Sequence, residues 1–414
     1  TSFGFVMRIL HLADVHLDTS FSGRDARIRA RLRQATRDAL RGAVELALDR
    51  DVHAVLVAGD LFDGARLSFE TERYLVDELT RLADAGIPVI YATGNHDPGS
   101  VRATRREIPW PQGVTVIGDG EPRRIPVRDR QGEVVGWVTG AGHASANETR
   151  DLAARFPAAR GPLPEVALLH TQVVGSREAE AHDPYAPAAL DTLVGAGYDY
   201  WALGHVHQRQ TLSDLPGVHY SGNLQGRTPR ETGPKGALLV EVNRGFAPQV
   251  EFHALAPVRW ETLTIRDAAD ADSLDGLLRL VKDRWAEARR ADPDPGAEWM
   301  VRVHLTGSTP LWRELEDDDD RAHLAGEMEA LLGALEVRLE ATAVHAPVSV
   351  EDHLGREDVL GVALRLVDRV RRGEAVLPGL EAELASGAGD GTPPFTELLE
   401  GAEAELVSRL LKEE

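Results

Sequence analysis

Apolar runs and helical periodicities alternate along the first part of the chain. The runs MRILHLAD, HAVLVAGD and IPVIYATG have the length and apolar content of strands, and the stretches between them repeat apolar residues every three or four positions. Helices are therefore expected over residues 24–49 and from a cap at Ser68 to Gly86. This order of strand, helix, strand, helix and strand predicts an α/β domain.

Strand patterns dominate the remainder of this first region, with one short helix expected near residues 187–195. Two β-rich runs that flank a short polar segment predict a hairpin. The strands expected here are VTVIG, the two arms of RRIPVRDRQGEVVGWVTG, EVALLHTQ, DYWALGH, GVHYSGN, GALLVEV and QVEFHAL.

A different pattern begins after Pro257. Three strands, RWETLTI, EWMVRVHLTG and EVRLEATAV, alternate with helices expected over residues 272–290 and 310–335. The acidic run at residues 316–320 lacks the alternating ligands and glycine of a Ca²⁺ loop, so we interpret it as a solvated turn. This region predicts a small α+β domain.

Strand patterns are absent after Val348. An amphipathic helix ends at Gly373, residues 386–394 have the composition of a linker, and a second amphipathic helix closes the chain. We expect the apolar sides of these helices to pack partly in a core and partly against a partner protein. We therefore divide the chain into three regions, residues 7–255, 256–346 and 347–414.

The composition is that of a globular protein, with 43% hydrophobic and 27% charged residues. No apolar run approaches the roughly 20 residues that span a bilayer, and the segment TSFGFVMRIL lacks the features of a secretory signal. We expect a cytoplasmic protein without a membrane segment. Cysteine is absent, which excludes thiolate chemistry and leaves His, Asp, Glu and Asn as metal ligands.

The charge balance is strongly acidic, with 67 Asp and Glu against 46 Lys and Arg and a net charge of -21. Such a chain repels phosphate backbones overall, so DNA binding would need local basic patches and bound cations. Several arginines could contact DNA phosphates, although a solvated surface is the more frequent role for such residues. They are Arg24, Arg27, Arg29, Arg31, Arg33, Arg37, Arg102, Arg105, Arg106, Arg227 and Arg230.

Five short polar motifs follow apolar strands in the first region, where α/β sheets build their sites. In D-x-H and H-x-H, the two side chains point to the same side of an extended backbone and can hold one cation or two adjacent cations. Glycines before three of the motif residues allow tight turns at the strand ends. The motif residues are Asp14, His16, Asp60, Asn95, His96, Asp97, His170, His205 and His207.

This mixed set of nitrogen and oxygen ligands suits Mn, Fe, Co or Zn better than Ca or Mg alone. A carboxylate such as Asp60 can bridge two cations about 3.5–4 Å apart, the arrangement that stabilises the attacking and leaving oxygens of phosphoryl transfer. The two cations also lower the pKa of bound water. The motifs therefore predict a metal-dependent phosphoesterase.

Taken in order, the five motifs resemble those of the calcineurin-like metallophosphoesterases. Longer segments resemble the SbcD and YhaO branch of bacterial DNA-repair exonucleases; they are ILHLADVHLD, VAGDLFD, ATGNHD, HDPYAP, DYWALGHVHQRQ and SGNLQGRTPRETGPKGALLVEV. The resemblance is close over residues 7–255. It implies a four-layer α/β/β/α sandwich with a small α+β capping domain and C-terminal helices.

The resemblance also implies roles for the motif residues. One metal ion, with Mn²⁺ the usual activating ion, would be held by Asp14, His16, Asp60 and His207. The other would be held by Asp60, Asn95, His170 and His205. His96 would stabilise the transition state and protonate the leaving oxygen, with Asp97 orienting it. Asp63 stands where the archaeal and eukaryotic branch often has a histidine.

The function implied is a two-metal DNA nuclease of DNA repair and recombination. The expectations are a 3′-to-5′ exonuclease on double strands with single-strand endonuclease activity, a homodimer, and a complex with an SbcC-like coiled-coil ATPase docked on the C-terminal helices. Two alternatives stay open. One is the same chemistry on a small phosphomonoester or phosphodiester, and the other is a DNA-end-binding scaffold protein with weak activity.

The alternative for the motif residues is a set of strand-end caps and satisfied core groups, which is disfavoured because burying so many polar groups without a metal is costly. His182 and Tyr185 stay open between a substrate-side loop and packing. The other histidines are alone or off-motif, and we expect them in solvated or core positions: His11, His53, His143, His219, His253, His304, His323, His345 and His353.

Overall fold

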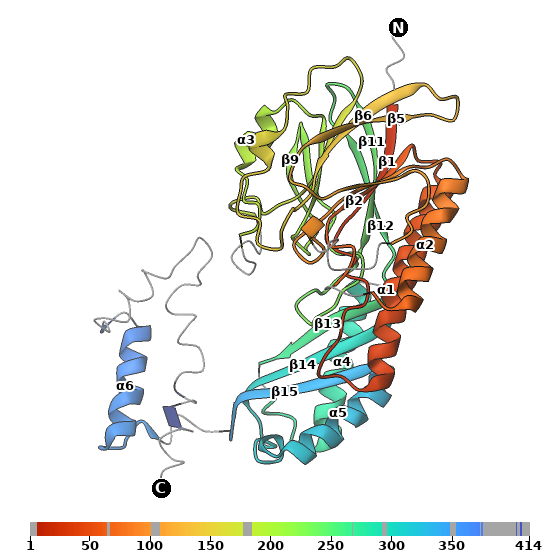
Figure 1. The fold of residues 1–414 in the computed structure, drawn as a ribbon. Coiled ribbons are helices and arrows are strands. Elements are labelled where there is room, and N and C mark those ends of the chain that lie inside the picture. Colours follow the sequence, from red (N-terminus) through yellow and green to blue (C-terminus); the bar gives the residue numbers. More distant parts are fainter. Residues whose placement is uncertain are drawn as a thin grey trace. The chain divides into compact units, whose positions relative to one another are not determined.

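The computed structural model places most of the chain in two compact units, and Figure 1 shows the ribbon. The first unit is Thr1–Trp260 with Gly296–Glu298, and the second is Glu261–Pro295 with Trp299–Glu414. The structure describes residues 6–63, 67–100, 108–176, 184–266, 268–291, 296–347, 353–372, 374–375, 403 and 406–407.

One six-stranded sheet of the first unit has the order β12-β11-β1-β2-β3-β4. Four strands are parallel to one another. Two more extend the sheet beyond β1: β11 is antiparallel to β1, and β12 is antiparallel to β11. The parallel strands are β1 (Val6–Leu12), β2 (Ala54–Ala58), β3 (Val89–Ala92) and β4 (Val114–Ile117). The antiparallel strands are β11 (Gly236–Asn243) and β12 (Gln249–Ala254).

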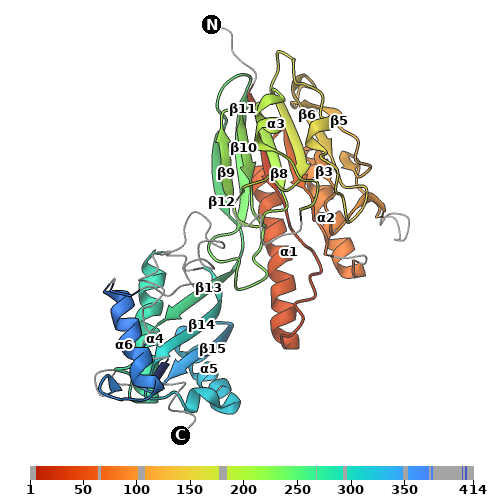
Figure 2. The ribbon, with the colours of Figure 1, turned by 90° about the vertical axis from the view of Figure 1, so that its left-hand side faces the viewer.

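Two helices connect β1 to β2 and β2 to β3, as the periodicity predicted. α1 spans Ala26–Asp49, and the Asp25 side chain caps it by accepting from two backbone N–H groups of the first turn. α2 spans Phe69–Asp84 and is capped by Ser68, the predicted residue. Both helices cover the outer face of the first sheet, where their apolar residues pack on β1, β2 and β3 (Figures 1 and 2).

The other six-stranded sheet has the order β5-β6-β7-β8-β10-β9. β5 and β6 form the predicted hairpin, and β6, β7, β8 and β10 are parallel. β9 was not predicted, because its sequence QTLSD lacks an apolar run. The elements are β5 (Arg123–Arg128), β6 (Val134–Ala141), β7 (Glu165–His170), β8 (Tyr200–Gly204), β9 (Gln210–Asp214), β10 (Gly217–Tyr220), the 3-10 helix η2 (Ala153–Arg155) and α3 (Leu190–Gly195).

The two sheets pack face to face through a continuous apolar core. Ile9, Leu56 and Ile90 from the first sheet share this core with Val138 and Leu168 from the second, and all five are buried. On its outer face the second sheet is covered by α3, η2 and loops. The predicted four-layer α/β/β/α sandwich is confirmed, with α3 as a much smaller outer layer than α1 and α2.

The second unit is built on a three-stranded sheet of order β13-β14-β15. The helix predicted to begin at Pro310 begins at Asp318, because the Asp317 side chain caps it there. Part of the acidic run is therefore the first turn of a helix, where negative charge is favourable. The elements are β13 (Val258–Ile265), α4 (Leu274–Ala291), β14 (Glu298–Ser308), the 3-10 helix η4 (Glu314–Glu316), α5 (Asp318–Leu332) and β15 (Glu336–His345).

A further helix, α6 (Val359–Arg371), follows in the C-terminal region. Leu360 and Leu364 on its buried side pack with Val407, whereas Val359 and Val362 are exposed. The predicted linker and nearly all of the predicted closing helix lie outside the described residues. No helix of the described part of the chain is long and apolar enough to cross a membrane.

Candidate metal centre

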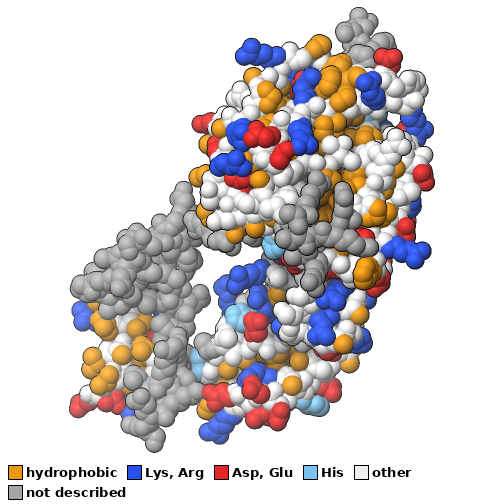
Figure 3. All heavy atoms as spheres, viewed as in Figure 1, with side chains coloured by type: hydrophobic (Ala, Val, Ile, Leu, Met, Phe, Trp, Pro, Cys, Tyr) orange, Lys and Arg blue, Asp and Glu red, His pale blue; other side chains and the backbone are white. Residues whose placement is uncertain are grey.

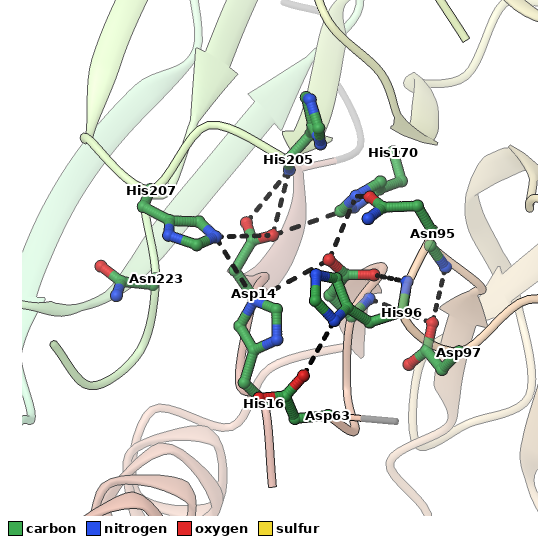
Figure 4. A network of polar contacts seen from close by, with 12 residues as sticks. Asp14, His16, Asp63, Asn95, His96, Asp97, His170, His205, His207 and Asn223 are labelled. Carbon is green, nitrogen blue, oxygen red and sulfur yellow. Dashed lines mark hydrogen bonds and ion pairs between the residues drawn. The ribbon is translucent and has the colours of Figure 1, made fainter. Parts of the chain in front are cut away.

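The motif residues meet where the strands of both sheets end. β1, β2 and β3 are parallel, so their carboxyl ends share one edge, and β7 and β8 share an edge of the second sheet. His170 Nδ1 donates to the carbonyl of Ala58 at 2.9 Å, and the His205 backbone N–H donates to the Asp14 carboxylate at 3.1 Å. These two contacts link the sheet edges, and Figure 4 shows the side chains gathered there.

Four motif residues have backbone conformations that side chains other than glycine rarely adopt. Asp14, His16 and Asp60 each have φ of 50°, and His205 has φ of 101°. Each such conformation costs on the order of 1–3 kcal/mol and persists only where the surroundings enforce it. Here the Asp14 N–H donates to the Gly59 carbonyl at 3.1 Å, and the His16 N–H donates to the Asp60 carbonyl at 2.9 Å. The backbone is therefore bent at the points where it presents these side chains.

Glycines allow the strand ends to approach one another. Gly59 has φ of +85°, and a Cβ there would overlap the His170 ring. Gly94 lies outside the positive-φ region, but its Cβ would overlap Asp60 Oδ1 and the Asp60 backbone nitrogen. The predicted tight turn thus needs positive φ at Gly59, whereas close packing alone requires glycine at Gly94.

Two groups of three motif side chains lie close enough to hold metal ions. Within the described residues, the ligand atoms of Asp14, His16 and His207 lie within 4.8 Å of one another, as do those of Asp14, Asp60 and His170. All five side chains are buried. Burial raises the pKa of Asp14 well above its usual value, and the nearby Asp60 raises it further. Burial also raises the pKa of Asp60. Two buried carboxylates side by side need a compensating cation to stay ionised.

The acceptor atoms around His170 fit a cation. His170 Nδ1 must be protonated because it donates to a carbonyl, and burial lowers the pKa of His170 to about 4, so the ring is neutral at pH 7. Its Nε2 therefore carries a lone pair, and it faces Asn95 Oδ1 at 2.9 Å and Asp60 Oδ2 at 3.5 Å. Three acceptor atoms converge here without a proton between them, which is the arrangement of a metal site.

The other group has a similar arrangement. His207 Nε2 lies 3.3 Å from His16 Nε2 and 3.8 Å from Asp14 Oδ1. His16 is fully buried, and its Nδ1 has no hydrogen-bond partner in the described part of the chain. Burial lowers the pKa of His16 well below its usual value, so this imidazole is also neutral at pH 7.

His96 lies beside these groups and is exposed to solvent, with its ring centroid 4.8 Å from that of His16. Its Nδ1 lies 2.8 Å from Asp63 Oδ1, and this hydrogen bond raises the pKa of His96. A raised pKa favours the protonated imidazole that a general acid needs. We expected Asp97 to make this contact, and Asp63 makes it instead.

Asp97 is placed under the loop that carries Asp60. Its carboxylate accepts from the backbone N–H groups of Leu61 at 2.5 Å, Phe62 at 3.2 Å and Gly94 at 2.7 Å, and from the hydroxyl of Tyr91. Asp97 is 4% exposed. Its contacts therefore hold the loops after β2 and β3 in place rather than the imidazole of His96.

His205 differs from the other predicted ligands. Its backbone N–H contacts Asp14, and its ring lies beside that of His170, with centroids 5.2 Å apart (Figure 4). None of the close ligand groups found among the described residues includes it. Tyr185, left open by the sequence, lies beside the same ring with a centroid distance of 5.8 Å, which places it at the site.

Glu231 is a site residue that the sequence analysis missed. Its Oε1 lies 3.0 Å from His207 Nδ1, while Oε2 accepts from Asn223 Nδ2 at 2.7 Å and from the Arg227 backbone N–H at 2.6 Å. Burial raises the pKa of Glu231, but the hydrogen bond with His207 and the charge of Arg227 outweigh it and lower the pKa to about 2. The ionised carboxylate only accepts, so His207 must donate through Nδ1, which leaves Nε2 facing the site.

His143 and His11 occupy the core positions expected of off-motif histidines. His143 Nε2 lies 2.7 Å from the His170 carbonyl, and His11 Nδ1 lies 2.9 Å from the Tyr200 hydroxyl. Both rings are fully buried. His143 thus holds the backbone of His170 through its carbonyl. No local sequence pattern indicated this contact.

Three of the arginines considered for DNA contact are paired within the protein, and three lie outside the described residues. On α1, Arg31 pairs with Glu298, Arg37 pairs with Glu70 at 3.1 Å, and Arg33 Nε donates to the Thr19 carbonyl at 3.0 Å. DNA phosphates would have to displace these intramolecular contacts to bind the same guanidinium groups. The arginines at positions 102, 105 and 106 lie outside the described residues, as does His182.

Comparison with known proteins agrees with this fold. Residues 7–209 match the calcineurin-like phosphoesterase family, and residues 260–346 match the middle domain of the metallophosphoesterase YhaO. The chain belongs to the calcineurin-like metallophosphoesterases, a family of hydrolases. The family and the candidate ligands together imply divalent metal ions.

Individual relatives refine this assignment. The chain is 34% identical over 310 residues to YhaO of Bacillus subtilis, an uncharacterized metallophosphoesterase, covering 74% of this chain and 73% of that protein. It is 30% identical over 392 residues to the SbcD component of the SbcCD nuclease of Rhodobacter capsulatus, covering 82% and 88%. It is 25% identical over 419 residues to the DNA double-strand break repair protein Mre11 of Methanopyrus kandleri, covering 95% and 86%. The protein is thus a metallophosphoesterase related to the SbcD and Mre11 nucleases.

Proposed function

We propose that this protein is a Mn²⁺-dependent DNA nuclease with two metal ions. The observation that carries the metal part of the proposal is the convergence of His170 Nε2, Asn95 Oδ1 and Asp60 Oδ2 without an intervening proton. The DNA part is supported by the relatives named as a component of the SbcCD nuclease and as Mre11. The activity expected is a 3′-to-5′ double-strand exonuclease with single-strand endonuclease activity.

The motif side chains divide between two ions in this proposal. Asp14, His16, Asp60 and His207 would hold one ion, and Asp60, Asn95, His170 and His205 would hold the other, with Asp60 shared between them. When bound, such ions lower the pKa of water and neutralise charge on the reacting phosphate.

The chain's own residues supply proton transfer and orientation. His96 donates a proton to the leaving oxygen. Asp63 accepts from Nδ1 of His96, and this hydrogen bond favours the protonated imidazole and fixes the orientation of the ring. Asp97 serves indirectly, by holding the backbone of the Asp60 loop. Glu231 fixes the ring of His207.

The net charge of -21 does not favour unaided DNA binding. On the face drawn in Figure 3, basic and acidic side chains are interspersed over the first unit, so binding depends on bound cations and individual basic residues. We propose a homodimer in complex with an SbcC-like ATPase that would assist binding. The exposed Val359, Val362 and Leu366 of α6 lie at three- and four-residue steps and support helix docking on such a partner.

Two other functions are distinguished by experiment. A small-substrate phosphatase or phosphodiesterase would use the same metal centre, and a DNA-end-binding scaffold would need little activity. The substrate that the protein turns over distinguishes the proposed nuclease from both alternatives.

The test compares DNA with small esters. The purified protein with Mn²⁺ is incubated with end-labelled duplex and single-stranded DNA, and separately with p-nitrophenyl phosphate and bis-p-nitrophenyl phosphate. His96→Ala removes the proposed acid, and His323→Ala, an exposed histidine of α5, is the matched control. We expect Mn²⁺-dependent DNA degradation that is lost in the first variant and kept in the second. Turnover of the esters without DNA cleavage, also after adding the ATPase, would refute the nuclease.

A further inference from the structure

Arg227 lies beside the metal centre, on the loop between β10 and β11. Its backbone N–H donates to Glu231 Oε2 at 2.6 Å, and its guanidinium Nη1 lies 3.4 Å from Asp63 Oδ2. The side chain is 15% exposed. The same Asp63 carboxylate holds His96 through its other oxygen. Asp63 therefore fixes a guanidinium and the proposed proton donor next to each other.

The guanidinium is poorly satisfied by the described part of the protein. An arginine has five N–H donors, and the long contact with Asp63 occupies one of them. Its Nε is buried and has no hydrogen-bond partner within the described residues. Leaving buried donors of a charged group unpaired costs free energy, which an anion bound at this position would recover.

The surroundings favour a phosphate as that anion. Arg227 lies close to the ligand groups. Burial is the main factor that lowers the pKa of His16, and the charge of Arg227 is the next; the same charge lowers the pKa of Asp14. Bound cations would neutralise the carboxylates of the ligand groups, so the guanidinium would add positive charge beside His96. Its planar fork matches two oxygens of a phosphate.

We propose that Arg227 binds a non-bridging oxygen of the phosphodiester next to His96 and so contributes to substrate affinity. This inference rests on the proposed phosphodiesterase function and adds one residue of substrate contact to it. The alternative is that Arg227 only pairs with Asp63 and supports the loop. That alternative predicts no change in affinity for phosphodiesters when the guanidinium is replaced.

The test measures binding without turnover. A fluorescently labelled single-stranded oligonucleotide with phosphorothioate linkages is titrated with Mn²⁺-loaded protein, and its anisotropy is recorded at several salt concentrations. Arg227→Gln removes the charge, Arg227→Lys keeps the charge without the fork, and Arg130→Gln is the control. Arg130 is 67% exposed at the β5–β6 turn, and β6 runs from that turn toward the edge where the metal centre lies.

We expect Arg227→Gln to weaken oligonucleotide binding by about 10- to 100-fold, the loss of one charged hydrogen-bonding group. The slope of log affinity against log salt should fall by about 0.7, which corresponds to one phosphate contact on a single strand. Arg227→Lys should lie between Arg227→Gln and the wild type. Mn²⁺ affinity, measured by calorimetry, should stay within about twofold of the wild type in both variants.

Unchanged oligonucleotide affinity and salt slope in both variants would overturn the inference. A parallel loss of Mn²⁺ affinity would also overturn it, because Arg227 would then support the metal centre. If Arg227→Gln does not fold, Arg227→Lys decides the question alone. If the wild type does not bind the oligonucleotide, the nuclease proposal fails separately, and a raised KM for bis-p-nitrophenyl phosphate in Arg227→Lys still tests the phosphate contact.

Discussion

Replacing Glu231 by Gln tests whether this carboxylate fixes His207 for metal binding. The carboxylate accepts on both sides, from His207 at 3.0 Å and from Asn223 and the Arg227 backbone at 2.7 and 2.6 Å. An amide of the same shape has one acceptor oxygen and one donor nitrogen. It can therefore satisfy His207 or the two donors on its other side, but not all three.

Each orientation of the amide has a distinct cost. If its oxygen keeps the two hydrogen bonds with Asn223 and the Arg227 backbone, its nitrogen faces His207 Nδ1, which must then accept. The proton of the neutral ring moves to Nε2, which lies 3.3 Å from His16 Nε2 and then offers no lone pair to a cation. In the opposite orientation His207 keeps its proton on Nδ1, but the donors of Asn223 and of the Arg227 backbone then face an amide nitrogen and lose their acceptor.

The expected loss follows from the first orientation, which keeps more hydrogen bonds. Removing the hydrogen-bond partner of a metal-binding histidine lowers metal affinity or activity about 10- to 100-fold. This is about 1.4–2.7 kcal/mol of binding free energy. We expect Glu231→Gln to weaken Mn²⁺ binding by this amount.

Calorimetric Mn²⁺ titration checks the prediction, with Glu165→Gln as the matched control. Like Glu231, Glu165 is a buried carboxylate with a basic partner: it is 2% exposed and pairs with Arg124. It begins β7, whereas His170 of the metal centre ends that strand, so Glu165 lies away from the site. The thermal unfolding of both variants is recorded alongside. Mn²⁺ affinity of Glu231→Gln within twofold of the control would refute the reasoning.

Three further predictions concern packing, pH and metal removal. Gly94→Ala should lower the free energy of urea unfolding by about 2 kcal/mol, because its Cβ overlaps Asp60, whereas Gly326→Ala in open space should not. Burial lowers the pKa of His219 from 6.5 to about 4, so stability falls as the pH drops through this window; His219→Phe should flatten that fall by about 3 kcal/mol, and an unchanged pH profile would contradict it. Mn²⁺ at a hundredfold excess over its Kd should raise the unfolding free energy by about 2.7 kcal/mol for each ion bound, compared with EDTA-treated protein, and equal melting curves would argue against binding to the folded state.

Local patterns predicted most elements of the fold. Periodicity located α1 and α2, and the predicted cap Ser68 precedes α2, whereas α1 begins at Ala26 rather than at residue 24 because Asp25 caps it. Local patterns failed where polar residues form structure. β9 has no apolar run, and the acidic residues around Asp318 begin a helix because of capping and the helix dipole.

The sequence by itself also determined which polar residues meet. Asp14 and Asp60 come shortly after strands and His170 ends one, and parallel strands end at one edge, so position along the chain was enough to predict their proximity. Only the tertiary structure decided how each group is held. Asp63 contacts His96 from 33 residues away, and Glu231 contacts His207 from 24 residues away. Neither contact leaves a periodicity or spacing in the sequence, because it depends on how loops from different strands fold over the same edge.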